Sequence, residues 1–480
     1  MTLQLSPRHI FSLVAAGALC ATALTVAGAG TAEAATGDTR TVAVPTLPST
    51  CTTLTSTLAT PSSRTFSSAQ ESAAPDTARI QAALTSCAGT GKAVVLAASG
   101  SDTAFLSAPL TIGSGVYLVL DTGVHLFASR KASDYQISGK ATCGTVTTSS
   151  TGCNPFISIT GSNSGIEGTQ SSSGAQGTID GRGDLDIYGT STTWWQQADT
   201  AQADGKDQVN PRLVQATGVS NTTVYDVNMV DAAKQHLFFS QDDGITVYGL
   251  RIKTVDTARN TDAIDIDSST NATVEYSYLM AGDDCLAVTT NKAAAAYITF
   301  QYNHCYGTHG ISIGSDTSYG VNSVLVYHNY IQGTDSNGTV SGVPAGLRIK
   351  SYSAVGGTVQ NIHYYTTCMT GLKYPLDFDP FYSSSTGTAY PYYKSVVVYK
   401  ATELSSLSGA KSVLEGYSAS YPLGLTLEDV SFDSNSYTAQ YATVAEYDTT
   451  LTPSGTGVTT STFTGSGSAP SCTFPAFPAL

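Results

Sequence analysis

A repeat of twenty to thirty residues constrains the fold of this chain more than any other feature. Apolar strand segments end at gaps of 23, 27, 26 and 26 residues, at Met229, Ile252, Leu279, Cys305 and Ile331. Each segment has an apolar residue five positions before its end: Val224, Val247, Val274, Phe300 and Val326. Such periods, each with several short strands, are typical of a β-solenoid rather than of a sandwich or a propeller.

The segments on either side of the repeat predict how the stack begins and ends. Asp76 and Thr77 can cap a short helix over residues 75–87, and such a helix would cover the first open edge. Long helical periodicity is nearly absent, which excludes an α/β barrel. We predict an all-β fold, a single-stranded right-handed parallel β-helix over residues 75–450 with this short N-terminal capping helix. An extended lead-in over residues 35–74 precedes it, and a Ser/Thr/Gly/Pro-rich tail over residues 451–480 follows.

The first 34 residues predict export. Arg8 and His9 precede an apolar run that extends to about Gly30, and Ala32-Glu33-Ala34 has the small-x-small cleavage pattern. We therefore expect a secretory signal peptide over residues 1–34 and a secreted mature protein. An uncleaved membrane anchor is the alternative, because the run is long enough to span a bilayer. No later stretch is apolar enough to do so.

Eight cysteines follow the signal, an even number that predicts disulfides in an exported chain. Cys143 and Cys153 bracket a Thr/Ser-rich loop and are expected to pair. A bridge between Cys51 and Cys87 would attach the lead-in to the first helix.

The charge of the chain narrows the class of its partners. Charged residues make up 12% of the sequence, and the formal net charge is −14. Such a balance argues against nucleic acid or an anionic membrane as the partner. If the partner is itself an anion, the few cations must be concentrated where it binds.

Four short motifs carry the candidate chemistry, and all lie in or after the repeat. They are Asn260-Thr261-Asp262, the pair Asp283-Asp284, His309-Gly310, and Arg348-Ile349-Lys350. Asp262 and Asp283 are 21 residues apart, close to one coil, so they should lie on neighbouring rungs about 4.8 Å apart. Like charges at that distance raise one pKa, and a carboxyl that stays protonated can act as a general acid. Paired carboxylates of this kind are what glycosidic hydrolysis requires.

In their order, the four motifs resemble those of the polygalacturonases, the pectin-cleaving branch of glycoside hydrolase family 28. The resemblance extends over roughly residues 75–435 and includes residues 177–183, Asn210-Pro211-Arg212-Leu213 and residues 310–315. It implies the same right-handed β-helix and hydrolysis of α-1,4 bonds between galacturonates with inversion, without a cofactor or a metal. Thr308 and Ala263 depart from the family, which usually has glycine at both positions, and Thr308 could alter the turn that holds His309.

The resemblance also implies roles for the site residues. Asp283 would be the general acid, Asp262 and Asp284 would hold and activate the water, and His309 would tune or orient Asp283. Arg348 and Lys350 should bind galacturonate carboxylates. Tyr382 matches a tyrosine that lines the cleft, and Asn260 belongs to the same substrate-binding set. A bridge between Cys285 and Cys305 is familiar in relatives, which leaves Cys368 and Cys472 to pair by elimination.

Several alternatives remain open at this stage. An exo-acting enzyme or a rhamnogalacturonan hydrolase would share the fold, although the latter generally lacks the Arg-x-Lys pair. A calcium-dependent pectate lyase would bind metal with the aspartates, and a non-catalytic β-helix binding protein would need no paired acids. Close carboxylates usually indicate a retaining enzyme, which opposes the inversion that the resemblance implies. We expect an endo-acting monomer whose partner is pectin or polygalacturonate.

Overall fold

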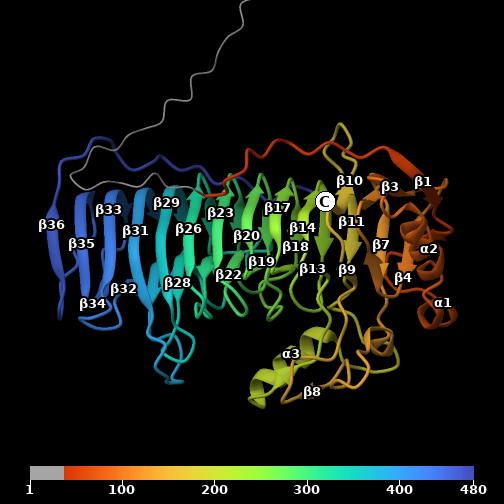
Figure 1. The fold of residues 1–480 in the computed structure, drawn as a ribbon, viewed down its shortest axis with the longest axis horizontal. Helices are drawn as coiled ribbons and strands as arrows, with labels where there is room; N and C mark the ends of the chain where they lie inside the picture. The colour runs from red at the N-terminus through yellow and green to blue at the C-terminus, as the bar shows by residue number, and fades with distance from the viewer. Residues whose placement is uncertain (1–36) are drawn as a thin grey trace, which may run out of the picture. The chain divides into compact units, whose positions relative to one another are not determined.

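A computed structural model describes residues 37–480, which form a parallel β-helix (Figure 1). The predicted fold class is confirmed. The signal peptide predicted over residues 1–34 lies outside the described residues. Within residues 37–480, no helix is both long enough and apolar enough to cross a membrane.

The rungs build three stacks of parallel strands. The first stack contains β3 (Lys92–Ala97), β6 (Val116–Leu120), β10 (Ser164–Gly168), β14 (Ser220–Tyr225), β17 (Asp243–Tyr248), β20 (Thr270–Glu275), β23 (Ala295–Gln301) and β26 (Val321–Tyr327). The second contains β4 (Asp102–Ser107), β7 (His125–Ala128), β11 (Gly177–Asp180), β15 (Val227–Val230), β18 (Arg251–Lys253), β21 (Tyr278–Met280), β24 (His304–Tyr306) and β27 (Tyr330–Gln332). Later long strands continue both stacks: β29 (Thr358–Thr370), β31 (Tyr392–Leu404), β33 (Leu423–Phe432) and β35 (Ala442–Thr449).

The third stack is a separate sheet of eleven strands. It contains β5 (Leu110–Ile112), β9 (Ile157–Ile159), β13 (Val214–Thr217), β16 (Leu237–Ser240), β19 (Ile264–Asp267), β22 (Leu286–Thr289), β25 (Ile311–Ile313), β28 (Ala345–Lys350), β30 (Tyr374–Asp379), β32 (Ser412–Glu415) and β34 (Tyr437–Gln440). The predicted site residues lie on this sheet or on the turns that enter it, except Tyr382, which follows the end of β30.

The register of the strands confirms the repeat expected from the sequence. Val224 pairs with Val247, which pairs with Val274, and the pairing continues through Phe300 to Val326. The second stack aligns its residues in the same way, from Met229 through Ile252, Leu279 and Cys305 to Ile331.

The core is the interior of the coil, where apolar side chains from the three stacks meet. Along β19, Ile264 and Ile266 are fully buried and point inward, so the residue between them, Asp265, faces outward. Burying one Val, Leu or Ile side chain stabilises the fold by roughly 1.5–3 kcal/mol. Repetition of this inward face on every rung therefore positions the outward polar residues of the third stack.

Turns between the first two stacks repeat one backbone conformation. Tyr276, Tyr302 and His328 occupy equivalent turns with φ of 54°, 56° and 51°, in the left-handed region. The residue that follows in two of these turns is an asparagine, and the Oδ1 of Asn329 accepts a hydrogen bond from the Asn303 backbone N–H at 2.9 Å. These bonds satisfy buried turn amides that the strand ladders leave unpaired.

The N-terminal end is covered as predicted, with differences in detail. Helix α2 (Thr77–Cys87) buries Ile80 and Leu84 against the first rungs. The predicted side-chain cap is absent, because Asp76 binds the Leu106 backbone N–H at 2.7 Å and Arg79 instead. The lead-in is also more ordered than expected. It contains β1 (Thr50–Thr55), β2 (Leu58–Ala59) and α1 (Ser68–Ala73), whose N-cap Ser67 and Gln70 form a capping box.

An insertion near the third stack was not predicted. It includes the 3₁₀ turn η1 (Ala132–Tyr135), the two-stranded pair β8 (Val146–Thr147) and β12 (Asp207–Gln208), and α3 (Trp194–Ala203). Figure 1 shows α3 and β8 extending away from the stacked strands. Trp194 is almost completely buried and packs edge-on against Tyr135, which gives the insertion a small core.

The C-terminal tail covers the second stack instead of ending loosely. After β36 (Thr459–Thr462) pairs with β35, the chain runs back over earlier rungs. Phe477 packs against Tyr278 and Tyr306, and the Ala479 carbonyl accepts a hydrogen bond from Arg251 at 2.8 Å.

All four expected disulfides are present, Cys51–Cys87, Cys143–Cys153, Cys285–Cys305 and Cys368–Cys472. The last of these attaches the tail to β29.

Candidate active site

The candidate catalytic side chains lie on three successive turns that enter the third stack. Ile264, Leu286 and Ile311 pair in register, so Asp262, Asp284 and His309 occupy equivalent positions two residues before them. Asp262 is therefore level with Asp284 on the next rung, whereas Asp283 precedes that level by one residue. The sequence spacing suggested that Asp262 and Asp283 are level, and the register corrects this by one position.

Asp283 is bound from both sides. Its Oδ1 lies 2.9 Å from His309 Nδ1, and its Oδ2 accepts a hydrogen bond from Asn260 Nδ2 at 3.2 Å. The Asp283 backbone carbonyl also accepts from the His309 N–H at 2.9 Å. These contacts orient the carboxyl while its side chain remains 17% exposed, enough for a substrate to reach it.

Asp284 is more deeply buried and is neutralised by a cation. Lys350 Nζ donates to its Oδ2 at 2.7 Å, and Ser312 Oγ donates to its Oδ1 at 2.7 Å. Lys350 is buried, which alone would lower the pKa of its ammonium, but the charges of Asp284, Asp283 and Tyr382 together raise it. Lys350 is thus a charged partner of a candidate catalytic carboxylate as well as a candidate substrate ligand.

Of the three candidate catalytic aspartates, Asp262 is the one whose pKa is strongly raised. Burial raises its pKa well above the ordinary value, and the charges of Asp265, Asp283 and Asp284 raise it further. Burial also raises the pKa of Asp265, which faces outward on β19, although the charge of Arg212 opposes this shift. We expected neighbouring negative charges to raise the pKa of one carboxyl at this site, and the carboxyl that they affect is Asp262.

Asp283 shows the opposite shift. Burial alone would raise its pKa, but the hydrogen bond and charge of His309, together with Lys350 and Arg348, outweigh burial and lower the pKa below its usual range. These directions favour a proton on Asp262 or Asp265 over one on Asp283. Coupled carboxyls of this kind titrate as a unit.

Arg348 and Lys350 share the outer face of β28 with an aromatic ring above them. Arg348 Nε donates to Asp377 Oδ2 at 2.7 Å. The Tyr382 ring centre lies 5.2 Å from the Arg348 guanidinium carbon and 5.3 Å from Lys350 Nζ, within cation–π range. Tyr382 is 45% exposed, whereas Arg348 and Lys350 are buried. Three of the four predicted substrate-binding residues thus lie together, and the fourth, Asn260, contacts Asp283.

The turns accommodate Gly310 and the two residues that depart from the family pattern, Thr308 and Ala263. Gly310 has φ of 89°, and a Cβ there would lie 2.4 Å from the Gly346 carbonyl, so this position requires glycine. Thr308 has no such backbone requirement and is buried, and His309 still reaches Asp283. Ala263 is also buried, and its N–H donates to the Asp284 carbonyl.

Sequence reasoning assigned no role to several residues of this cluster. Asp265, Ser312 and Asp377 alternate with buried apolar residues on neighbouring third-stack strands, and Gln208 reaches Asn260 from the insertion at 2.8 Å. The alternation of apolar and polar residues in Ile264-Asp265-Ile266 and Ile311-Ser312-Ile313 is the signal that could have indicated the first two.

Asp283, Asp284 and His309 also offer three potential metal ligands within 4.8 Å of one another. Their chemistry does not suit calcium, which prefers six to eight oxygen ligands. One of the three donors is a nitrogen, and the Lys350 ammonium already lies on Asp284. The donor set therefore fits a proton-transfer site better than a calcium site.

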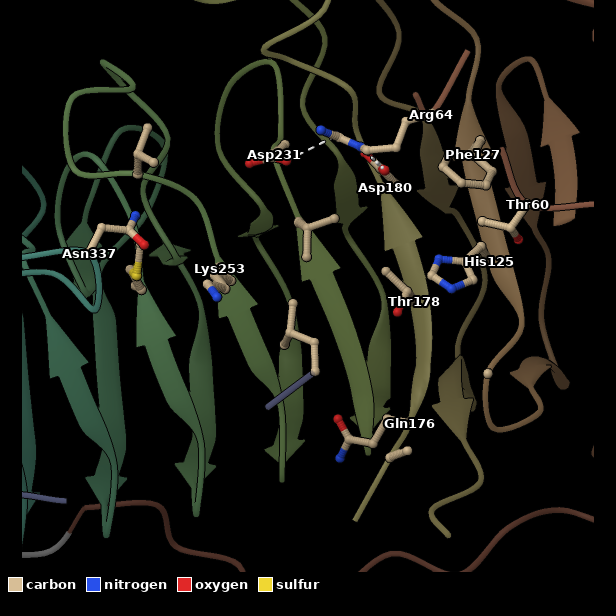
Figure 2. A pocket seen from close by; sticks show the side chains of 16 residues that line it. Thr60, Arg64, His125, Phe127, Gln176, Thr178, Asp180, Asp231, Lys253 and Asn337 are labelled. Atoms are coloured by element: carbon tan, nitrogen blue, oxygen red, sulfur yellow. Dashed lines mark hydrogen bonds and ion pairs between the residues drawn. The ribbon is translucent and has the colours of Figure 1, made fainter. Parts of the chain in front are cut away.

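Another cavity, of about 390 Å³, lies over the second stack (Figure 2). Arg64 points into it and binds Asp180 at 2.6 Å and Asp231 at 2.9 Å, and His125 and Lys253 line it as well. None of the predicted site residues is among its lining residues. The ion pairs of Arg64 connect the lead-in to the rungs, which is a structural role.

A parallel β-helix with clustered carboxylates beside cations fits a glycoside hydrolase. The family model described as glycosyl hydrolases family 28 matches residues 106–452. The chain belongs to this family.

Its relatives include enzymes named polygalacturonases. A polygalacturonase of Ralstonia solanacearum is 37% identical over 398 residues, which cover 75% of this chain and 73% of the relative. An endo-polygalacturonase of Pectobacterium carotovorum subsp. carotovorum is 35% identical over 362 residues, covering 75% and 85% of the two chains. Among solved structures, the polygalacturonase from Erwinia carotovora ssp. carotovora superposes with a TM-score of 0.75 at 34% identity, covering 85% of this chain and 99% of the other.

Proposed function

We propose that this chain is a secreted endo-polygalacturonase, which hydrolyses α-1,4 bonds between galacturonate units inside the pectin chain and inverts the anomeric configuration. The observation that carries the proposal is the juxtaposition of three aspartates with Arg348 and Lys350 on one face of the third stack. Carboxylates supply acid–base chemistry, and cations beside them suit a substrate with a carboxylate on every sugar.

The proposed reaction uses the aspartates in two roles. Asp283 gives its proton to the glycosidic oxygen as the bond between that oxygen and the anomeric carbon breaks. A water held between Asp262 and Asp284 attacks the anomeric carbon from the opposite face and loses a proton to one of them. Their level positions on adjacent rungs support this pairing. Because water is the nucleophile, the product has the inverted configuration.

Substrate binding can raise the pKa of Asp283, so that Asp283 takes up the proton that it must donate. The charges of Lys350 and Arg348 help to lower the pKa of Asp283. A galacturonate carboxylate bound to these cations would offset their charge, and the pKa of Asp283 would rise. Once Asp283 is protonated, its repulsion of Asp262 is lost, so Asp262 can release its proton and accept one from water.

Two further aspects rest on the relatives and the disulfides. Cleavage inside the chain is supported by the 35% identical relative that is named an endo-polygalacturonase. Secretion is supported by four disulfides, which form and persist in oxidising compartments.

Parallel measurements of viscosity and reducing ends during digestion of polygalacturonate test the function. An endo-acting hydrolase lowers viscosity steeply while few bonds are broken, and its rate is unchanged by a chelator. Viscosity that falls only in proportion to released monogalacturonate would indicate exo cleavage. Loss of activity with chelator, together with unsaturated products that absorb ultraviolet light, would indicate a lyase and contradict the proposal.

A further inference from the structure

A cavity of about 370 Å³ lies on the outer side of the third stack, on the N-terminal side of the catalytic turns. Arg212 and Lys234 line it together with Ser158, Gln215 and Thr217. Because Val214 pairs with Leu237 and Leu237 with Ile264, Arg212 is level with Asp262 and lies two strands before it. Two strand spacings correspond to roughly 10 Å.

The guanidinium of Arg212 is held in place by uncharged groups. Its Nε donates to Gln235 Oε1 at 3.1 Å, its Nη1 donates to Gln215 Oε1 at 2.9 Å, and the group lies 3.6 Å from the Phe238 ring centre. Within residues 37–480, no carboxylate lies within 4.0 Å of it, and its Nη2 has no hydrogen-bond partner. The guanidinium of Arg212 is therefore held in one orientation, and the N–H groups of its Nη2 are left to bind a ligand.

Lys234 is a second cation in the same cavity. It is half-buried, and in the part of the chain that the structure describes its ammonium makes no ion pair or hydrogen bond. Burial and the charge of Arg212 lower its pKa to about 8, while Asp262, Asp265 and Asp207 oppose that shift from a distance. Partly desolvated cations are costly unless an anion binds them.

Within residues 37–480, Arg212 and Lys234 form no ion pair, although the net charge of the chain is −14. Most arginines of the described residues bind carboxylates directly, as Arg64, Arg182 and Arg348 do. In residues 37–480, Asp262, Asp265, Asp267 and Asp207 act on these two cations only from beyond ion-pair distance. The cavity can therefore bind an anion in direct contact with both cations.

We propose that this cavity is a substrate subsite, in which Arg212 and Lys234 bind the carboxylate of a galacturonate unit away from the bond that is cleaved. The guanidinium of Arg212 would donate hydrogen bonds to the carboxylate, and the ammonium of Lys234 would attract it as a point charge. This inference rests on the proposed function, since it needs a substrate chain with repeated carboxylates. It also places carboxylate-binding groups on both sides of the catalytic aspartates.

Kinetics on substrates of different length test the subsite. Lys234→Gln and Arg212→Gln should lower kcat/KM on octagalacturonate about tenfold, the effect of losing one charge-assisted hydrogen bond. On trigalacturonate, which extends at most two units from the cleaved bond toward the cavity, the loss should be less than threefold. Methyl-esterified octagalacturonate should also lose less, because it lacks the carboxylate charge.

A matched control is Lys394→Gln on β31, which lies on another stack and should match the wild type on both substrates. Melting temperatures identify any variant that fails to fold, and Lys234→Gln provides the test if Arg212→Gln is unstable. Equal losses on short and long substrates would overturn the subsite and favour a structural role for the cations near Asp262. If the wild type does not hydrolyse polygalacturonate, the proposed function fails, and the subsite fails with it.

Discussion

The Asp283 carboxyl must donate a proton in the proposed reaction, yet its partners favour the ionised form in the free enzyme. His309 and Asn260 bind it directly, and Lys350 and Arg348 act on it through their charges. Burial and three nearby acids raise the pKa of Asp262 instead. In the proposed reaction, the charge of the bound substrate raises the pKa of Asp283 so that it can carry the proton.

Replacing the donor tests this assignment. Asp283→Asn should lower kcat by about 10²–10⁴-fold, because the amide keeps the shape but cannot act as the acid. Affinity for octagalacturonate and the melting temperature should stay close to the wild-type values. Asp243→Asn, an exposed aspartate on the first stack, is the matched control and should retain full activity. More than a tenth of wild-type turnover in Asp283→Asn would exclude Asp283 as the general acid.

At the scale of elements, the unpredicted insertion contacts the catalytic turn. Asn210 Nδ2 donates to Gln208 Oε1 at 2.8 Å, and Gln208 Nε2 donates to Asn260 Oδ1 at 2.8 Å. Because the Asn260 oxygen accepts this bond, its amide nitrogen faces Asp283. Gln208 at the end of β12 is thus a positioning residue that acts through Asn260.

Changes at Gln208 should alter turnover rather than binding. Gln208→Ala frees the Asn260 amide to rotate and should lower kcat roughly tenfold, with KM nearly unchanged. Gln208→Glu should be worse, because a carboxylate attracts the Asn260 nitrogen and turns its oxygen toward Asp283. Steady-state kinetics on polygalacturonate measure both effects, and Gln202→Ala on the exposed face of α3 is the control. Full activity of Gln208→Glu would rule out the positioning role.

The repeating elements could be predicted from the sequence because one residue pattern recurs on every rung. The alignment from Val224 to Val326 is the observed register, and the order of the motifs brought Asp262, Asp284 and His309 to successive turns. The motifs fall one coil apart, so their proximity follows from the period alone.

The other features of the site depend on contacts that do not repeat along the sequence. Gln208 reaches Asn260 across 52 residues from an insertion without repeat spacing. Lys350 and Asp284 are buried partners that lie 66 residues apart in the sequence and two strands apart in the third stack. The pKa shifts of Asp262 and Asp283 depend on burial and on which partner each oxygen faces, and neither can be read from spacing. For the same reason, the contacts of the tail with the second stack cannot be read from the sequence.

At the scale of the whole molecule, buried carboxyls predict how stability depends on pH. Burial raises the pKa of Glu403 to about 8 and that of Glu167 to about 7. These groups stay protonated in the folded state at a pH where the unfolded chain has lost those protons. The folded state then binds more protons, so the free energy of unfolding falls as pH rises through this window.

Histidines act in the opposite direction, but only at lower pH. Burial lowers the pKa of His236, His304 and His363 to about 4, so they favour folding as pH rises toward 6.5 and have little effect above it. Between pH 6.5 and 8 the carboxyls dominate, and the melting temperature should fall by roughly 2–5 °C. Calorimetry across this range measures it, and Glu403→Gln should show a smaller fall. A melting temperature that rises toward pH 8 would contradict the assignment.

The central claim is that Asp283 protonates the leaving oxygen while Asp262 and Asp284 direct a water to the opposite face. Proton NMR of the anomeric signals during the first minutes of polygalacturonate hydrolysis tests it most directly. We predict that the new reducing ends appear first in the β configuration and then mutarotate. Initial appearance of α-configured ends would mean that an aspartate attacks the sugar itself, and it would contradict the roles assigned to all three aspartates.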